Sequence, residues 1–379
     1  MTTAKSHEVL PGRTQFMRAM ALMVCVWTWP NAFGATNAEK PSNPAVAEDG
    51  TVHVPAFDLP LSVYMSSEAK KALREQLRSS APSAPTTDFR KDFIKVREQV
   101  RLSIEPLRKR VVERYPVETR EHVYAGVHAV VVTPRQGIAL GNRNKVLINL
   151  HGGGFAVGDA SSIGVVESAP LAAILKIEVV SVDYRQGPEF QFPAASEDVT
   201  AVYRALLQYY KARDIGIFGC SAGGLLTAQA LAWFQKERLP RPGAAGIFCA
   251  SGDARWGGDA FFTVPPMNGQ APISPAAPPD YDEKYYYGNH DLKDPLMSPV
   301  VSRDILRQFP PTLLISATRA GELSAAVNTH TQLVKAGIDA DLHVWDGMWH
   351  AFYFDADLPE SREAYEVMAK FFANHLGRH

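Results

Sequence analysis

The chain has 379 residues, 46% of them hydrophobic, and a formal net charge of −1. This balance excludes a disordered chain, and the lack of a basic excess excludes nucleic acid as an expected partner. We therefore expect a soluble globular protein with one large α/β domain and a cap. The spacing of Cys220 and Cys249 is typical of neither a zinc site nor a disulfide framework, so no bound metal is expected.

The N-terminal segment has the pattern of an export signal. An apolar run at residues 19–29 follows Arg18, and Ala32 and Gly34 have the small-residue spacing that a signal peptidase requires. The run is too short to span a bilayer, which favours a cleaved signal over a stable membrane anchor. We expect residues 1–34 to be removed near Gly34 and the protein to be periplasmic or secreted.

Two alternatives remain for this segment: translation that begins at Met17 rather than Met1, and an apolar helix that belongs to the cap. Residues 35–55 are rich in proline, alanine and charge, which predicts a flexible linker. Within residues 56–120, apolar side chains recur at helical spacing among many charges from about residue 66. This pattern predicts two or three amphipathic helices that form an N-terminal cap.

From residue 121 to residue 379 the pattern changes to short β-branched runs that alternate with helical stretches. This order predicts a mostly parallel sheet with helices on both faces, in which reactive groups gather at the C-terminal ends of the strands. The expected strands lie within residues 127–134, 145–153, 177–185, 214–224, 244–253, 311–318 and 340–347.

The stretch "FGCSAGG" places Ser221 in a G-x-S-x-G motif between a strand and a helical run. Glycines at 219 and 223 suit a sharp turn that lifts the serine hydroxyl above the sheet, where it can act as a nucleophile. The helix that follows would present the Ala222 N–H to a developing oxyanion. Because Cys220 directly precedes the serine, we predict that bulky thiol reagents inhibit the protein by modifying Cys220.

Two further motifs follow predicted strands. The glycines of "HGGGF", at residues 151–155, let backbone N–H groups converge on one point, which predicts Gly153 and Gly154 as oxyanion donors. His350 in "GMWHAF" comes after the last predicted strand and C-terminal to Ser221, which is the order expected for a catalytic base in this fold.

Together these motifs and the stretches "DYRQGPEFQFPAASED" and "DPLMSPV" resemble the hormone-sensitive-lipase-like branch of the α/β-hydrolases, over roughly residues 123–376. The resemblance implies an α/β-hydrolase fold and a carboxylesterase that needs no cofactor. It implies Ser221 as nucleophile, His350 as base, and Gly153, Gly154 and Ala222 as the oxyanion hole.

The chain departs from the family where the acid of the triad belongs. Members usually have aspartate at the position of Ala320, and alanine cannot orient an imidazole. Glu322, two residues further along the loop, is our first choice, because a modest loop shift would bring its carboxylate to His350 Nδ1. The alternative is that Glu322 is only an acidic residue in the first turn of a helix, where the helix dipole favours negative charge. Asp253 after the preceding strand and Asp346 near the histidine remain rival acids.

We therefore predict hydrolysis of short- to medium-chain carboxylic esters through a Ser-His-acid triad and an acyl-enzyme. A small-molecule ester is the expected partner, and a homodimer is a possible assembly. The alternatives are an impaired hydrolase that binds a small molecule without turnover, and an amidase or lactonase with the same triad. The long aromatic and proline-rich insertion at residues 253–291 is predicted to line the substrate pocket or to pack the cap.

Overall fold

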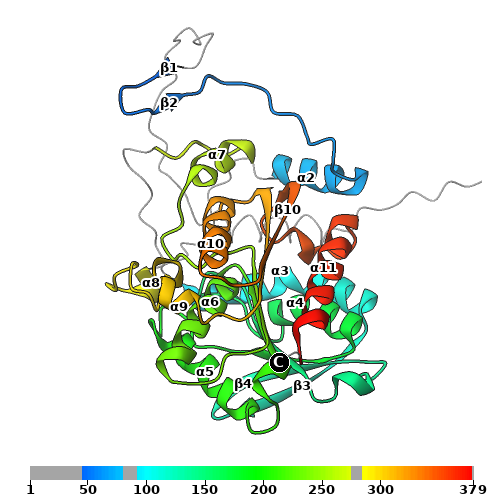
Figure 1. The fold of residues 1–379 in the computed structure, drawn as a ribbon. Coiled ribbons are helices and arrows are strands. Elements are labelled where there is room, and N and C mark those ends of the chain that lie inside the picture. Colours follow the sequence, from blue (N-terminus) through cyan, green and yellow to red (C-terminus); the bar gives the residue numbers. More distant parts are fainter. Residues whose placement is uncertain (1–44, 80–91, 275–283, 378–379) are drawn as a thin grey trace, which may run out of the picture.

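The structure is a computed structural model that describes residues 45–79, 92–274 and 284–377. A twisted sheet lies at its centre (Figure 1). This sheet has eight strands in the order β10-β9-β8-β7-β5-β6-β4-β3. β4 pairs antiparallel with both β3 and β6, and the other pairings are parallel. The predicted mostly parallel sheet flanked by helices is confirmed.

All of the predicted strands are present. They are β4 (Val127–Pro134), β5 (Val146–Leu150), β6 (Glu178–Val182), β7 (Ile215–Cys220), β8 (Ala244–Phe248), β9 (Thr312–Arg319) and β10 (Ala340–Trp349). A strand that the sequence did not predict, β3 (Val117–Tyr124), forms one edge of the sheet. It contains residue 121, so the predicted start of the catalytic domain falls inside a strand.

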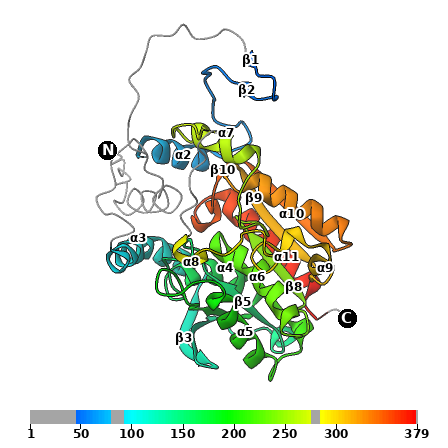
Figure 2. The ribbon, with the colours of Figure 1, turned by 90° about the vertical axis from the view of Figure 1, so that its left-hand side faces the viewer.

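Helices cover both faces of the sheet (Figure 2). A separate hydrophobic core lies between the sheet and each helical layer. One layer packs α4 against α3 and α11, and the other packs α5 against α6. The helices of the catalytic region are α4 (Ile163–Leu175), α5 (Ala194–Leu206), α6 (Ala222–Lys236), α7 (Asp259–Met267), α8 (Lys284–Tyr287), α9 (Arg303–Leu306), α10 (Leu323–Lys335) and α11 (Pro359–His375). Short 3-10 helices lie at Leu140–Asn142, Ala212–Asp214, Pro299–Val301 and Phe352–Phe354.

In the described part of the region predicted as a cap lie two helices, α2 (Ser67–Ser79) and α3 (Phe93–Arg114). The Arg97 guanidinium of α3 donates to the Ala156 and Gly187 carbonyl oxygens at 2.7 Å and forms a bidentate pair with Glu189. These bonds attach α3 to the loops that follow β5 and β6. This helix of the predicted cap therefore lies next to the C-terminal edge of the sheet.

The predicted signal segment lies outside the described residues. The described part of the predicted linker contains two short antiparallel strands, β1 (Ala45–Val46) and β2 (Val52–His53). In the part of the chain that the structure describes, no helix combines the length and the apolar character that a bilayer span requires.

Candidate active site

The candidate nucleophile lies on a strained turn between β7 and α6. Ser221 has φ 58° and ψ −124°, a backbone conformation that residues other than glycine rarely adopt. A Cβ atom at Gly219 would lie 2.2 Å from the Leu150 oxygen, and one at Gly223 would lie 1.8 Å from the same atom. Both glycines are therefore required by the close approach of β5, as the G-x-S-x-G motif predicts.

The loop after β5 supplies backbone donors beside this turn. A Cβ atom at Gly152 would lie 3.5 Å from Ser221 Cβ, which places the glycine loop in contact with the nucleophile. Within the described residues, the Gly153 and Gly154 N–H groups have no hydrogen-bond acceptor, so both are available to a ligand. The Ala222 N–H opens α6 at the same place, where the helix dipole favours negative charge.

His350 and Glu322 meet at the C-terminal ends of β9 and β10. The His350 Nδ1–H donates to Glu322 Oε2 at 3.0 Å, and the two side chains are only 14% and 1% exposed. The Ser316 hydroxyl of β9 donates to the other carboxylate oxygen, Oε1, at 3.3 Å. Each carboxylate oxygen of Glu322 thus accepts a hydrogen bond. Because His350 uses Nδ1 for its bond to Glu322, Nε2 is the ring nitrogen that remains free.

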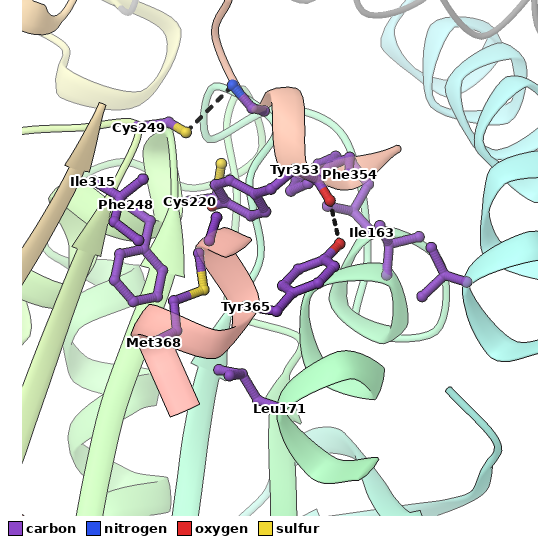
Figure 3. Close-up of a cluster of buried hydrophobic side chains, with 14 of the residues drawn as sticks. Ile163, Leu171, Cys220, Phe248, Cys249, Ile315, Tyr353, Phe354, Tyr365 and Met368 are labelled. Carbon is purple, nitrogen blue, oxygen red and sulfur yellow. Dashed lines mark hydrogen bonds between the residues drawn. The ribbon is translucent and has the colours of Figure 1, made fainter. Parts of the chain in front are cut away.

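A chain of contacts through Cys249 fixes this pair relative to Ser221. The Ser221 N–H donates to the Phe248 oxygen at 2.9 Å, and Cys249 follows Phe248 directly. The Ala351 N–H donates to Cys249 Sγ at 3.2 Å, the bond drawn in Figure 3. His350 is therefore tethered, through its neighbour, beside the strand end that holds Ser221. Among the described residues no hydrogen bond joins the Ser221 hydroxyl to His350, a contact that is often long in free enzymes.

Two opposing effects act on the imidazole of His350. Burial disfavours its charged form, while the charge and the hydrogen bond of Glu322 favour it. The carboxylate prevails and raises the pKa of His350 to about 9. The histidine is therefore a stronger base than a solvated one, and its basicity depends on Glu322.

The structure places the two rival acids elsewhere. Asp253 forms a bidentate pair with Arg255, with N–O distances of 2.8 and 2.6 Å. Asp346 accepts from the Thr318 hydroxyl at 3.1 Å and from the Ser62 hydroxyl. Ala320 is buried, and its methyl side chain has no group that could orient an imidazole.

The aromatic insertion contributes a residue that the sequence did not single out. The Tyr285 hydroxyl donates to the Gly154 oxygen at 2.6 Å, and the Tyr286 ring stacks on Phe155 with centroids 4.4 Å apart. The end of the insertion therefore packs on the glycine loop. Its density in tyrosine was the available signal, but the sequence does not say which tyrosine reaches the loop.

Two further properties of the site concern the reactivity of the Cys220 thiol and the binding of a metal ion. Cys220 is buried, and desolvation raises the pKa of its thiol well above its usual range, which argues against the predicted attack by bulky thiol reagents. Across the described ranges, no three histidine, cysteine or acidic side chains form a cluster that could hold a metal ion.

Comparison with known proteins shows the family to which the chain belongs. The family model for the alpha/beta hydrolase fold matches residues 147–354. The chain belongs to this family. Its predicted resemblance to the hormone-sensitive-lipase-like branch is likewise confirmed.

Individual relatives agree with this placement. An acetyl-hydrolase of Streptomyces hygroscopicus is 30% identical over 235 residues, which cover 62% of this chain and 77% of that protein. A solved esterase from the bacterial hormone-sensitive lipase family matches with a TM-score of 0.68 and 26% identity, over 82% of this chain and 99% of that chain. Esterase E25 matches with a TM-score of 0.66 and 28% identity, over 85% and 99% of the two chains.

Proposed function

We propose that this α/β-hydrolase is a serine esterase in which Ser221, His350 and Glu322 form the catalytic triad. The observation that carries the proposal is the 3.0 Å bond from His350 Nδ1 to the buried Glu322 carboxylate. It supplies an acid for the histidine although Ala320 stands where the family resemblance implies an aspartate. The chain is thus a carboxylic ester hydrolase of the hormone-sensitive-lipase-like type, like its relatives named esterases and acetyl-hydrolase.

The triad would act in two steps. His350 Nε2 takes the proton of the Ser221 hydroxyl while its oxygen attacks the ester carbonyl, and the alcohol leaves with that proton. A water molecule, activated by the same nitrogen, then releases the acid from the acyl-enzyme. Glu322 keeps the imidazole in the required tautomer and stabilises its charged form in both steps.

The oxyanion of each tetrahedral intermediate needs donors already in place. Ala222 directly follows Ser221, and Gly152, which precedes Gly153 and Gly154, lies in contact with the serine. The Gly153 and Gly154 N–H groups have no acceptor within the described residues. Fixed donors of this kind are worth about 10²- to 10³-fold in rate each. We therefore assign the oxyanion hole to these three backbone groups.

Short- to medium-chain carboxylic esters are the substrates that we propose. The test is hydrolysis of p-nitrophenyl esters from acetate to dodecanoate by the wild type and by Ser221→Ala. The proposal predicts wild-type turnover that is highest on the shorter esters and absent from Ser221→Ala. A wild type no faster than Ser221→Ala on every ester would instead favour a binding protein that keeps the fold without turnover.

We also propose that the protein is exported through cleavage near Gly34. The support is the sequence alone, in which an apolar run follows Arg18 and ends at small residues. Expression of the full chain in a bacterium, followed by fractionation and N-terminal sequencing, tests this. A mature protein that begins after Gly34 outside the cytoplasm is expected, and an intact N-terminus in the cytoplasm would contradict it.

A further inference from the structure

Glu167 is the one charged residue of α4, a helix that is mostly buried and apolar. α4 is buried from Ile163 to Ala172, and Glu167 is only 4% exposed. Burial raises the pKa of Glu167 to about 8, although hydrogen bonds from Gly152, Asn149 and Cys220 favour the ionised form. An apolar side chain would fill this position without the cost of burying a carboxyl group. The carboxyl therefore requires an explanation other than the stability of the helix.

Both oxygens of Glu167 accept hydrogen bonds from the C-terminal end of β5. Oε1 accepts from the Gly152 N–H at 2.8 Å, and Oε2 accepts from the Asn149 side-chain amide at 2.8 Å. Asn149 in turn accepts from the Ser181 hydroxyl of β6 at 2.8 Å, which fixes its amide orientation. Since a protonated carboxyl group keeps one acceptor oxygen, the bond to Gly152 is possible in either protonation state.

The sequence of α4 brings this carboxyl group close to the sheet. A Cβ atom at Gly164 would lie 2.0 Å from Ser181 Oγ, so only glycine allows the helix to approach β6 this closely. Glu167 follows three residues later and lies on the same face of the helix. The glycine and the acid thus act together to place a carboxyl group against the glycine loop.

Gly152 links Glu167 to the proposed oxyanion hole. A Cβ atom at Gly152 would lie 3.5 Å from Glu167 Oε1 and 3.5 Å from Ser221 Cβ, so this residue lies between the two. It directly precedes Gly153 and Gly154, whose φ angles are 131° and 59°. No side chain of their own restricts these glycines, so their N–H directions depend on how the neighbouring backbone is held.

We propose that Glu167 is a positioning residue that aims the Gly153 and Gly154 N–H groups by holding the Gly152 N–H. This inference rests on the proposed esterase function. Oxyanion donors act on the transition state, so their misplacement should lower kcat and leave KM nearly unchanged. A misplacement of about 1 Å costs on the order of 10²-fold in rate.

The test compares two substitutions with a control on the same helix. Glu167→Leu removes both acceptors at similar volume, while Glu167→Gln keeps one oxygen for Gly152. Ser168→Ala is the control, because Ser168 is equally buried and its hydroxyl has no partner among the described residues. With p-nitrophenyl butyrate we expect kcat per titrated active site to fall about 30- to 100-fold in Glu167→Leu and several-fold in Glu167→Gln. KM should stay within about twofold, and Ser168→Ala should behave as the wild type.

A second variant keeps the test decisive if Glu167→Leu does not fold. In the double variant Asn149→Asp/Glu167→Gln the carboxyl and amide groups exchange places. The glutamine oxygen can then accept from Gly152, while its amide donates to the carboxylate introduced at position 149. The double variant should recover most of the activity that Glu167→Gln loses. Affinity for a trifluoromethyl ketone, which forms a tetrahedral adduct with the serine, should follow kcat/KM across the series.

The inference is overturned if Glu167→Leu and Glu167→Gln keep wild-type kcat per active site, or if the double variant recovers nothing relative to Glu167→Gln. A variant that lowers the melting temperature and the number of titrated sites, with unchanged kcat at each, would show a structural role only. Failure of the esterase function itself is a different result, since the wild type would then be no faster than Ser221→Ala.

Discussion

At the scale of single residues, the position of the triad acid is the most informative feature. The loop after β9 has Ala320 at the position where the family resemblance implies an aspartate, yet the Glu322 carboxylate still reaches His350. Glutamate has one more methylene than aspartate, and Glu322 is the N-cap residue of α10, directly before the helix begins. The longer side chain and this position at the start of α10 together compensate for the shift of two residues.

Replacement of Glu322 by glutamine should therefore remove most of the activity. Glutamine can leave the histidine in the wrong tautomer and cannot stabilise its charge, and loss of a triad carboxylate costs about 10⁴-fold in kcat. Asp253→Asn and Asp346→Asn are matched controls, because Arg255 and Thr318 engage those carboxylates. Steady-state hydrolysis of p-nitrophenyl butyrate measures the effect. A larger loss in either control than in Glu322→Gln would move the acid to that residue.

The pH dependence of kcat/KM should report the His350–Glu322 pair. Only the neutral imidazole accepts the serine proton, so the rate should rise with pH until it passes the pKa of His350, which Glu322 raises to about 9. Without the carboxylate, burial is the largest remaining effect on His350, and it lowers the pKa. In Glu322→Gln the rising limb should therefore move to lower pH by at least about two units. A limb at the same pH in both proteins would mean that another group controls the profile.

At the scale of elements, the turn between β7 and α6 depends on how closely β5 passes it. Gly223→Ala would place a methyl group 1.8 Å from the Leu150 oxygen, so either the turn or the strand must move. We expect a loss of about 3 kcal/mol or more in the free energy of unfolding, together with loss of activity. Gly141→Ala is the control, because a Cβ there meets nothing within 4 Å. Urea unfolding of both variants provides the comparison, and equal stability would refute the steric argument.

The same scale shows what the sequence could and could not predict. The strands from β4 to β9 were predictable because mainly buried, apolar residues fill them and turns bound them. β10 was predictable from its place in the alternation of strands and helices, although its first seven residues are partly or fully exposed. β3 was not, because between Val117 and Tyr124 its side chains are exposed and largely charged, as an edge strand allows. Ser221 and His350 follow from motifs at strand ends. Glu167 is visible in the sequence as an isolated acid in the apolar run of α4. Its contact with Gly152 could be recognised only in the three-dimensional structure.

At the scale of the whole molecule, the His350–Glu322 pair couples stability to pH. A histidine whose folded-state pKa is raised from about 6.5 to about 9 stabilises the fold fully below pH 6.5, and this contribution is lost as pH rises through 9. The shift corresponds to at most about 3 kcal/mol. The protonation state that favours folding is thus the inactive one, so stability and catalysis should change in opposite directions with pH.

This coupling predicts that the melting temperature depends differently on pH in the wild type and in Glu322→Gln. From pH 6.5 to pH 9 the melting temperature of the wild type should fall further than that of Glu322→Gln, which lacks the ion pair. Differential scanning calorimetry across this range measures both proteins. Parallel curves for the two proteins would show that the pair contributes no pH-dependent stability.

The most direct test of the account is the rate and site of reaction with a fluorophosphonate, measured by mass spectrometry. A serine activated by His350 and surrounded by oxyanion donors should take up one label per chain, and the modified peptide should carry it on Ser221. Glu322→Gln should react at least about 100-fold more slowly, while Asp253→Asn and Asp346→Asn should match the wild type. A folded wild type that reacts no faster than Ser221→Ala, or that carries the label on another residue, would contradict the proposed triad.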